Sequence, residues 1–263
     1  MAVGNAFVRV LEEDPELAAD LDPTSVQLAT RHAIAAVEVI APGSWEPVLP
    51  ADGGTGSLGL LVLDGLLMRD VRFAQAACTE LIGRGDLLRP WDWERDILTI
   101  KPVVTWTALQ PVRLAVLDRR ITAVMGRWPE LVSAVVARAV RRSFELATSQ
   151  ATSHLTRVDA RLELLFWGLA DRWGRVSTDG VVLELPLTHQ VLGRLVGAQR
   201  PSVTTRSHDP LRVRGDGSTV RYSTSVTATR ARPASRSIET VDSWGMSMRV
   251  VRLNRSINHS CGG

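Results

Sequence analysis

Polar side chains of the types that bind nucleic acids gather in one short stretch of the chain. They are Thr188, Gln190, Gln199, Arg200, Ser202 and Thr205. An arginine can form two hydrogen bonds with a guanine edge, whereas hydroxyl and amide groups commonly bind phosphate oxygens. Arg200 is therefore the candidate for reading a base, and the other five are candidates for positioning the protein on a phosphate backbone.

Two short helices joined by a glycine turn would position these side chains. Thr188 is a good N-cap, and Leu192, Leu195 and Val196 recur at helical spacing, which predicts a helix from Thr188 to Val196 with one buried stripe. Gly197 supplies a left-handed turn, and Pro201 suits the first turn of a second helix. Gly193 leaves room for that helix to cross closely. The pattern from Leu187 to Thr205 is that of a helix-turn-helix, although an ordinary helical hairpin is the alternative.

The pattern stops abruptly after Thr205. Arg206 places a charge where the second helix needs an apolar contact, and Pro210 disfavours helix just before it. We therefore expect a truncated recognition helix and an incomplete wing. Residues 206–263 have the composition of a disordered basic tail, and a one-base slip of the reading frame near Thr205 is a second explanation.

The positive charge of the chain comes mostly from this tail. The net charge is +3 and the isoelectric point about 9.5, but residues 206–263 contain ten arginines and four acidic residues. The preceding part therefore carries a net negative charge, so overall basicity is not evidence for nucleic-acid binding. The electrostatic support is local and comes from Arg172, Arg175, Arg194 and Arg200.

The first part of the chain changes from helical to strand patterns. Val10–Leu21 and Pro23–Ile40 have helical patterns, with a strand possible near Val37. Short apolar runs separated by turn residues follow from Gly43 to Leu117, which predicts an antiparallel β-domain. The Asp64-Gly65 pair between two such runs is its strongest hairpin signal.

A long helix and a shorter one are predicted next. Leu131–His154 contains no proline or glycine and has an apolar stripe. That stripe could pack on the β-domain or on its twin in a dimer, and its length favours the dimer. Val158–Trp173 has a second helical pattern, Gly174–Gly180 is a predicted turn, and Val181–Leu185 is a predicted strand.

In this order, residues from about 25 to 205 resemble the Crp/Fnr family of bacterial transcription factors. Leu187–Thr205 is the most specific match, and Gly59–Met68, Gly85-Asp86 and Ala108–Asp118 are looser ones. The resemblance implies an α+β fold in which an effector-sensing antiparallel β-roll, cyclic-nucleotide-binding-like, precedes a long dimerisation helix and a C-terminal winged helix-turn-helix. The implied domains are 1–125, 126–154 and 155–205, followed by the tail 206–263. By the same resemblance, Thr188, Gln190, Arg200, Ser202 and Thr205 fall on DNA-contact positions, and Gln199 on a phosphate contact.

The chain departs from the family where cyclic nucleotides bind. The family has a Gly-Glu pair and then an arginine followed by a small hydroxyl residue, whereas this chain has Arg89-Pro90-Trp91-Asp92-Trp93. We therefore expect no cyclic AMP and leave the effector unknown. Trp91, Trp93 and Trp106 could line an apolar effector pocket, but tryptophans that fill a β-core are the more common case.

No metal or cofactor is expected. Cys78 and Cys261 are far apart, no N-terminal cysteine set could hold an iron–sulfur cluster, and His32 alone is a weak haem ligand. Asp92, Glu94 and Asp96 lie among arginines, which favours a solvated charged loop.

The leading interpretation is a dimeric, effector-responsive regulator that binds a two-fold symmetric DNA site, with RNA polymerase as a further partner. The alternative is a ligand-binding dimer that has lost specific DNA binding after Thr205. No nucleophile and base stand out, so we expect no enzyme. The chain has no apolar run long enough to span a membrane, and its N-terminal region is too acidic for a signal peptide. We therefore expect a cytoplasmic protein.

Overall fold

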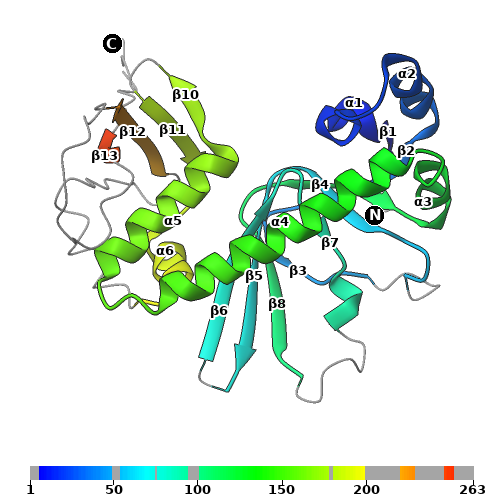
Figure 1. Ribbon diagram of the computed structural model, residues 1–263. Helices are drawn as coiled ribbons and strands as arrows, with labels where there is room; N and C mark the ends of the chain where they lie inside the picture. The colour runs from blue at the N-terminus through cyan, green and yellow to red at the C-terminus, as the bar shows by residue number, and fades with distance from the viewer. Residues whose placement is uncertain are drawn as a thin grey trace, which may run out of the picture. The chain divides into compact units, whose positions relative to one another are not determined.

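The computed structural model describes residues 6–48, 54–74, 76–93, 101–177, 180–198, 220–228 and 246–251. The chain divides into two compact units, Met1–Ala151 and Thr152–Gly263. The first unit contains two antiparallel sheets and the second contains one (Figure 1). None of the described helices is long and apolar enough to cross a membrane.

Two sheets form the body of the first unit, which confirms the β-domain predicted between Gly43 and Leu117. The strand orders are β1-β2-β9-β4-β7 and β3-β8-β5-β6. The strands are β1 (Ala6–Arg9), β2 (Ile34–Ile40), β3 (Gly43–Trp45), β4 (Gly59–Asp64), β5 (Leu66–Phe73), β6 (Ala76–Gly83), β7 (Leu87–Leu88), β8 (Val103–Ala108) and β9 (Val112–Leu117). Two strands, β1 and β2, come from outside the predicted range and extend the first sheet.

The hairpin predicted at Asp64-Gly65 is wrong. β4 pairs with β7 and β9, whereas β5 pairs with β6 and β8, so the chain passes from one sheet to the other at this point. Gly65 has a φ of +94°, and a Cβ atom there would lie 2.7 Å from Cα of Val112. A sheet-crossing corner needs a positive φ just as a hairpin turn does, so the dipeptide alone does not distinguish the two.

The N-terminal helical patterns are shorter than expected. Val10–Leu21 contains the four-residue helix α1 (Val10–Glu13) and the 3₁₀ turn η1 (Pro15–Ala18). Pro23–Ile40 divides into α2 (Pro23–His32) and the strand β2, which begins at Ile34 rather than near Val37. β2 forms early because it pairs with β1 on one side and β9 on the other.

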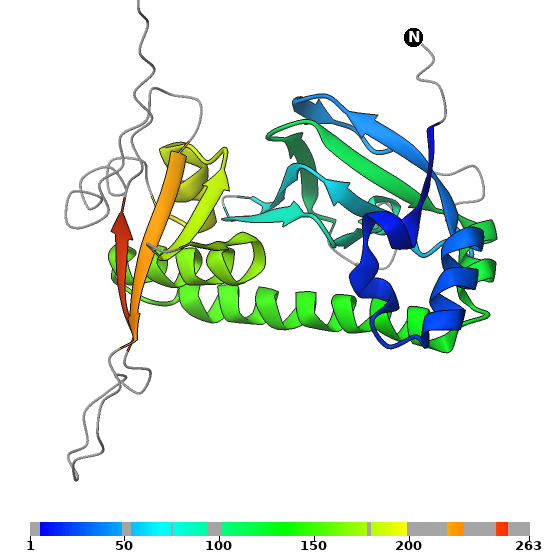
Figure 2. The ribbon, with the colours of Figure 1, turned by 90° about the horizontal axis from the view of Figure 1, so that it is seen from above.

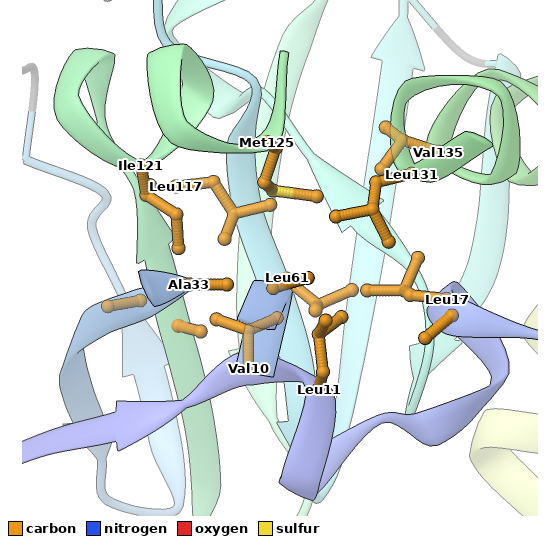
Figure 3. Close-up of a cluster of buried hydrophobic side chains, with 14 of the residues drawn as sticks. Val10, Leu11, Leu17, Ala33, Leu61, Leu117, Ile121, Met125, Leu131 and Val135 are labelled. Carbon is orange, nitrogen blue, oxygen red and sulfur yellow. The ribbon is translucent and has the colours of Figure 1, made fainter. Parts of the chain in front are cut away.

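The predicted long helix is confirmed as α4 (Pro129–Ser153), which follows the shorter α3 (Arg119–Met125). Figures 1 and 2 both show the first turns of α4 beside α1 and α2. Its buried residues, Leu131 and Val135, join a core formed by the sheet β1-β2-β9-β4-β7 and the neighbouring helices. Figure 3 shows this core, with Val10, Leu11, Leu17, Ala33, Leu61, Leu117, Ile121 and Met125. Burial of each large apolar side chain stabilises the unit by about 1.5–3 kcal/mol.

The second unit packs helices with one antiparallel sheet of order β10-β11-β12-β13. Its elements are α5 (Val158–Trp173), β10 (Arg175–Ser177), β11 (Gly180–Leu185), α6 (His189–Leu195), β12 (Val220–Ala228) and β13 (Met246–Val251). α5 confirms the helix predicted from the same residues. The prediction that Gly174–Gly180 is a turn is wrong, because Arg175–Ser177 form a strand that pairs with β11.

Two segments of the expected disordered tail are strands in the structure. β12 pairs with β11, and β13 pairs with β12. β12 contains valine, threonine and tyrosine, and β13 ends in two valines, all of which favour strands, although the composition of the whole tail hides this. The other residues of 206–263 lie outside the described part of the chain.

Candidate nucleic-acid interface

The candidate interface begins where β11 leads into α6. Thr188 has an extended backbone with φ −87° and ψ 161°, and its Oγ1 accepts a hydrogen bond from the backbone N–H of Val191 at 3.2 Å. The N–H of Leu192 donates to the carbonyl of Thr188 at 2.9 Å and forms the first intrahelical bond. The predicted N-cap is confirmed, because the cap satisfies an N–H that the first turn cannot satisfy itself.

Thr188 and Gln190 are the two predicted contact residues that the structure describes, and both are exposed. The Thr188 hydroxyl accepts a hydrogen bond within the helix, but its own hydrogen remains able to donate to an outside acceptor. The amide of Gln190 can likewise donate from the exposed surface of α6. The two side chains can therefore bind oxygens of a phosphate backbone, as their residue types predict.

The end of α6 forms a Schellman turn. The N–H of Ala198 donates to the carbonyl of Gly193 at 2.8 Å, and that of Gly197 donates to the carbonyl of Arg194 at 3.2 Å. Gly197 has a φ of +62°, which confirms the predicted left-handed turn. This pair of bonds is the usual way to close a helix at a left-handed glycine, and it reverses the chain just before Gln199.

A residue of α5 also holds this turn, and sequence reasoning missed it. Nη1 of Arg161 donates to the carbonyl of Val196 at 2.7 Å and to that of Gly197 at 3.4 Å. A cation at the C-terminal end of a helix is favourable because the last carbonyls carry partial negative charge. No local pattern links Arg161 to residues so far along the chain, so only the packing of α5 could reveal its position.

The inner face of α6 is apolar. Val191, Leu192 and Val196 are buried, whereas Leu195 is only half-buried. The predicted buried stripe of Leu192, Leu195 and Val196 is therefore confirmed at Leu192 and Val196 but not at Leu195, and Val191 is an addition to it. Gly193 is buried as expected, but the helix predicted to cross it lies outside the described residues.

Four of the six predicted contact residues, Gln199, Arg200, Ser202 and Thr205, lie outside the described residues. Of the arginines expected to support them, Arg194 is exposed on the last turn of α6, and Arg175 is exposed at the start of β10. The guanidinium of Arg172 lies 4.2 Å from the centre of the Trp173 ring. The helix-turn-helix as a whole therefore stays a prediction whose first helix and turn have the expected geometry.

The first unit contains the segment that the resemblance identifies with effector binding. The turn between β6 and β7 is closed by Asp86, whose carboxylate accepts from the N–H of Gly83 at 2.8 Å. Main-chain bonds of 2.9 Å join Val62 to Gly85 and to Asp86, so the turn is tied to β4. The Gly85-Asp86 pair is thus a tight turn, as expected.

The residues after this turn are bound to other parts of the same unit. Arg89 donates to Asp92 at 2.7 Å and also to the carbonyl of Ser57. Its guanidinium lies 5.6 Å from the centre of the Trp91 ring. Asp92 lies in the 3₁₀ turn η2 (Pro90–Trp93) and is only 33% exposed, so it is not part of the solvated loop that was expected. Glu94 and Asp96 lie outside the described residues.

Trp91 and Trp106 are core residues, which is the second of the two alternatives for the tryptophans. They expose 3% and 5% of their surface, and the Trp106 ring meets Trp45 edge to face at 5.7 Å. Aromatic pairs prefer this geometry. The same core contains Ile40, Leu60, Val62, Leu67, Ile82, Leu88, Ala108, Val112 and Leu114. The side chain of Trp93 lies outside the described residues.

The candidate metal and redox residues are not clustered. In the described ranges, no group of three His, Cys, Asp or Glu side chains could hold a metal ion. His32 is exposed at the end of α2, and Cys78 is a free, exposed thiol on β6. Partial burial of that thiol, together with the negative charge of Glu80, raises the pKa of Cys78 above its ordinary value. Cys261 lies outside the described residues.

Solved structures share this fold at low sequence identity. A CooA mutant from Carboxydothermus hydrogenoformans is 15% identical, with a TM-score of 0.54, over 78% of this chain and 88% of its own. A cyclic nucleotide-binding domain containing protein from Listeria monocytogenes EGD-e is 10% identical, with a TM-score of 0.54, over 70% and 87%. The c-di-GMP responsive global regulator CLP of Xanthomonas campestris is 15% identical, with a TM-score of 0.50, over 76% and 98%. No family profile and no curated protein matches the sequence.

The chain has the fold of the Crp/Fnr regulators. The resemblance is therefore confirmed at the level of the fold, whereas the second half of the predicted motif, from Gln199 to Thr205, lies outside the described residues.

Proposed function

We propose that the chain is a Crp/Fnr-type transcription regulator that binds a two-fold symmetric DNA site as a homodimer and responds to an effector. The observation that carries the proposal is the geometry of α6. Thr188 caps the start of the helix, and Gly197 forms the turn that ends it. The side chains of Thr188 and Gln190, at the start of the helix, are exposed. In a chain with this fold, that geometry is what a support helix of a DNA reader requires.

The turn at Gly197 supports a reading role for Arg200. It directs the chain away from α6 two residues before Gln199, and Pro201 suits the start of a new helix. Arg200 then precedes the first turn of that helix, which is where such motifs contact base edges. Gln199, Ser202 and Thr205 are proposed as contacts to the phosphate backbone, together with Thr188 and Gln190.

The exposed face of α4 supports the dimer. Val136, Val140 and Phe144 follow each other at intervals of one helical turn and expose 55%, 47% and 69% of their surface. Large apolar side chains in such a row are costly to leave in water, and an identical helix offers a matching row. We therefore propose that α4 packs against α4 of a second copy.

The effector is proposed by analogy only. CLP is a c-di-GMP responsive regulator, and a protein with this fold can transmit a ligand signal if the ligand shifts its long helix. The bonds of Arg89 to Asp92 and Ser57 give no support to cyclic AMP. RNA polymerase remains a predicted partner, and the chemical class of the effector is left open.

Selection from a random DNA library would test DNA binding. We expect the full chain to enrich a two-fold symmetric sequence, with an affinity that falls as salt rises because phosphate contacts release counterions. Arg200→Ala should weaken binding to that sequence by about 1–3 kcal/mol. The measurement is fluorescence anisotropy over a salt series.

Arg120→Ala is the matched control, because it removes the same charge from an exposed site on α3 in the other unit. It should leave the affinity for the selected sequence unchanged. If no sequence is enriched and random DNA binds equally well, the chain instead fits a ligand-binding dimer that has lost specific DNA binding. Equal losses for both variants would contradict the role of Arg200.

A further inference from the structure

One carboxylate on β6 joins α4 to the second sheet. Glu80 forms an ion pair with Arg69 of β5 and another with Arg142 of α4. Arg69 and Glu80 are direct cross-strand neighbours, so their side chains lie on the same face of the sheet. All three side chains are largely buried, with 11% of the Glu80 side chain and 20% of the Arg142 side chain exposed. Ion pairs at such sites are screened little by salt.

The neighbours of this carboxylate orient it and its partners. The guanidinium of Arg69 lies 5.3 Å from the Trp106 ring centre, which anchors it to the core. Burial of Arg69 lowers its pKa, and the charge of Glu80 works against that shift. Arg142 spans Glu80 and Glu145, and the second contact is 3.3 Å within α4 itself. The planar guanidinium of Arg142 is therefore held in one direction, toward β6.

A second arginine one turn earlier repeats the arrangement. Arg138 forms a two-pronged ion pair with Asp14, and one of its bonds is 2.8 Å long. The same guanidinium donates to the carbonyl of Gly85 at 3.2 Å. Burial opposes the charge of Arg138, but the hydrogen bond and charge of Asp14 outweigh it and raise the pKa. Arg138 and Arg142 are four residues apart and therefore lie on one face of α4.

The apolar row of α4 lies on the opposite face. Val140 is two residues from each arginine, which corresponds to about 200° of rotation in a helix of 3.6 residues per turn. Beyond Val135, α4 has no buried residue in the described structure, and the ion pairs of Arg138 and Arg142 join this part of the helix to the rest of the unit. Hydrogen-bonded ion pairs are directional, whereas apolar contacts are not. The ion pairs can therefore set which face of this segment points outward.

We propose that Glu80 is a positioning residue that latches α4 to the β-sheet and thereby turns Val136, Val140 and Phe144 toward a second copy of the chain. The latch lies within one chain, because the carboxylate that binds Arg142 belongs to Glu80 of the same chain. The proposal deepens the proposed dimer and rests on it for the identity of the partner. The latch itself can be tested without the dimer.

Hydrogen exchange of the full chain, measured by mass spectrometry, tests the latch. In Glu80→Gln and Arg142→Gln we expect amides of 139–151 to exchange about tenfold faster or more, because each variant removes the ion pair that joins α4 to β6. The segment 131–137 and strand β6 should keep their rates. Arg142→Lys keeps the charge but loses the fork, and should give an intermediate rate in 139–151.

Arg141→Gln is the matched control, because Arg141 is the exposed neighbour of Arg142 on the same helix. It should leave all rates unchanged. Unchanged rates of 139–151 in both latch variants would overturn the proposal. Faster exchange throughout both sheets would also overturn it, because Glu80 would then stabilise the whole unit rather than orient one helix.

Sedimentation equilibrium on the same samples separates the two proposals. We expect Glu80→Gln to weaken self-association, while Arg141→Gln leaves it intact. If the unchanged chain does not self-associate, the proposed dimer fails, and the exchange rates of 139–151 still decide whether the latch exists. Self-association that is undiminished in Glu80→Gln, together with faster exchange, would contradict the link between the latch and the dimer.

Discussion

The two halves of α4 are attached to the rest of the first unit by different forces. The first half inserts Leu131 and Val135 into the core, whereas the second half is attached through Arg138 and Arg142. Apolar burial gives most of the free energy of docking but tolerates small rotations of the helix. Ion pairs contribute less net stability, because charges lose hydration on burial, but they require a particular orientation. The difference suggests that one half stabilises the unit and the other sets the outward face.

The largest effect should come from the apolar half. Leu131 is fully buried, and Leu131→Ala should lower the free energy of unfolding of the first unit by about 2–5 kcal/mol through lost burial and a cavity. Urea denaturation measures this loss. Val136→Ala is the control at an exposed position of the same helix and, in a sample dilute enough to be monomeric, should change stability by less than about 0.5 kcal/mol. Equal effects of the two variants would remove the basis of the comparison.

A smaller loss is expected from the charged half. Arg138→Gln leaves the buried carboxylate of Asp14 without its guanidinium, which should cost about 2 kcal/mol of unfolding free energy. In a double-mutant cycle, the double variant with Arg138→Gln and Asp14→Asn should be more stable than the two single losses together predict, because both charges are then absent. Arg141→Gln provides the baseline. A cycle without coupling would mean that the Arg138 contact contributes nothing specific.

The thiol of Cys78 should report on the charge of Glu80. Because the folded pKa of Cys78 is raised, less thiolate is present at neutral pH, and alkylation should be slow and accelerate as pH rises through that pKa. Glu80→Gln removes a negative charge and leaves two arginines nearby, so the pKa should fall and alkylation at fixed pH should become severalfold faster. The experiment uses a Cys261→Ser background. A slower reaction in Glu80→Gln would contradict the arrangement of charges around the thiol.

The smallest effect on stability is expected on the exposed face. Phe144→Ala should change the unfolding free energy by less than about 0.5 kcal/mol, since Phe144 is 69% exposed. Self-association of the chain should nevertheless weaken, which sedimentation velocity would detect. A substantial loss of stability in a dilute sample would show that Phe144 packs within its own chain and would contradict the proposed dimer face.

Local elements of the fold were predictable because their signals lie within a few residues. The N-cap at Thr188, the turn at Gly197 and the length of α4 depend on contacts one helical turn away or less. The corner at Asp64-Gly65 was not predictable. Its glycine indicates a positive φ, but the pairing of β4 with β9 and of β5 with β8 decides where the chain goes next.

The residues of the candidate site also differ in whether a local pattern reveals them. Thr188 and Gln190 were identified from residue type and helical spacing, and the structure leaves both exposed. Arg161 was missed, because its partner carbonyl on Val196 is 35 positions away along the chain. The segments β12 and β13 were also missed, since their strand pattern is short within a tail of polar composition.

By itself, the sequence determined the bounds of α4, α5 and α6 to within two residues, which stretch of α4 is apolar and which polar residues flank the turn at Gly197. These properties depend on backbone preferences and on periodicity, which act over a few residues. Only the tertiary structure decided which face of α4 is outward, because the bond between Arg142 and Glu80 joins residues 62 positions apart. Contacts at that separation depend on how the sheets and helices pack, and no local pattern contains that information.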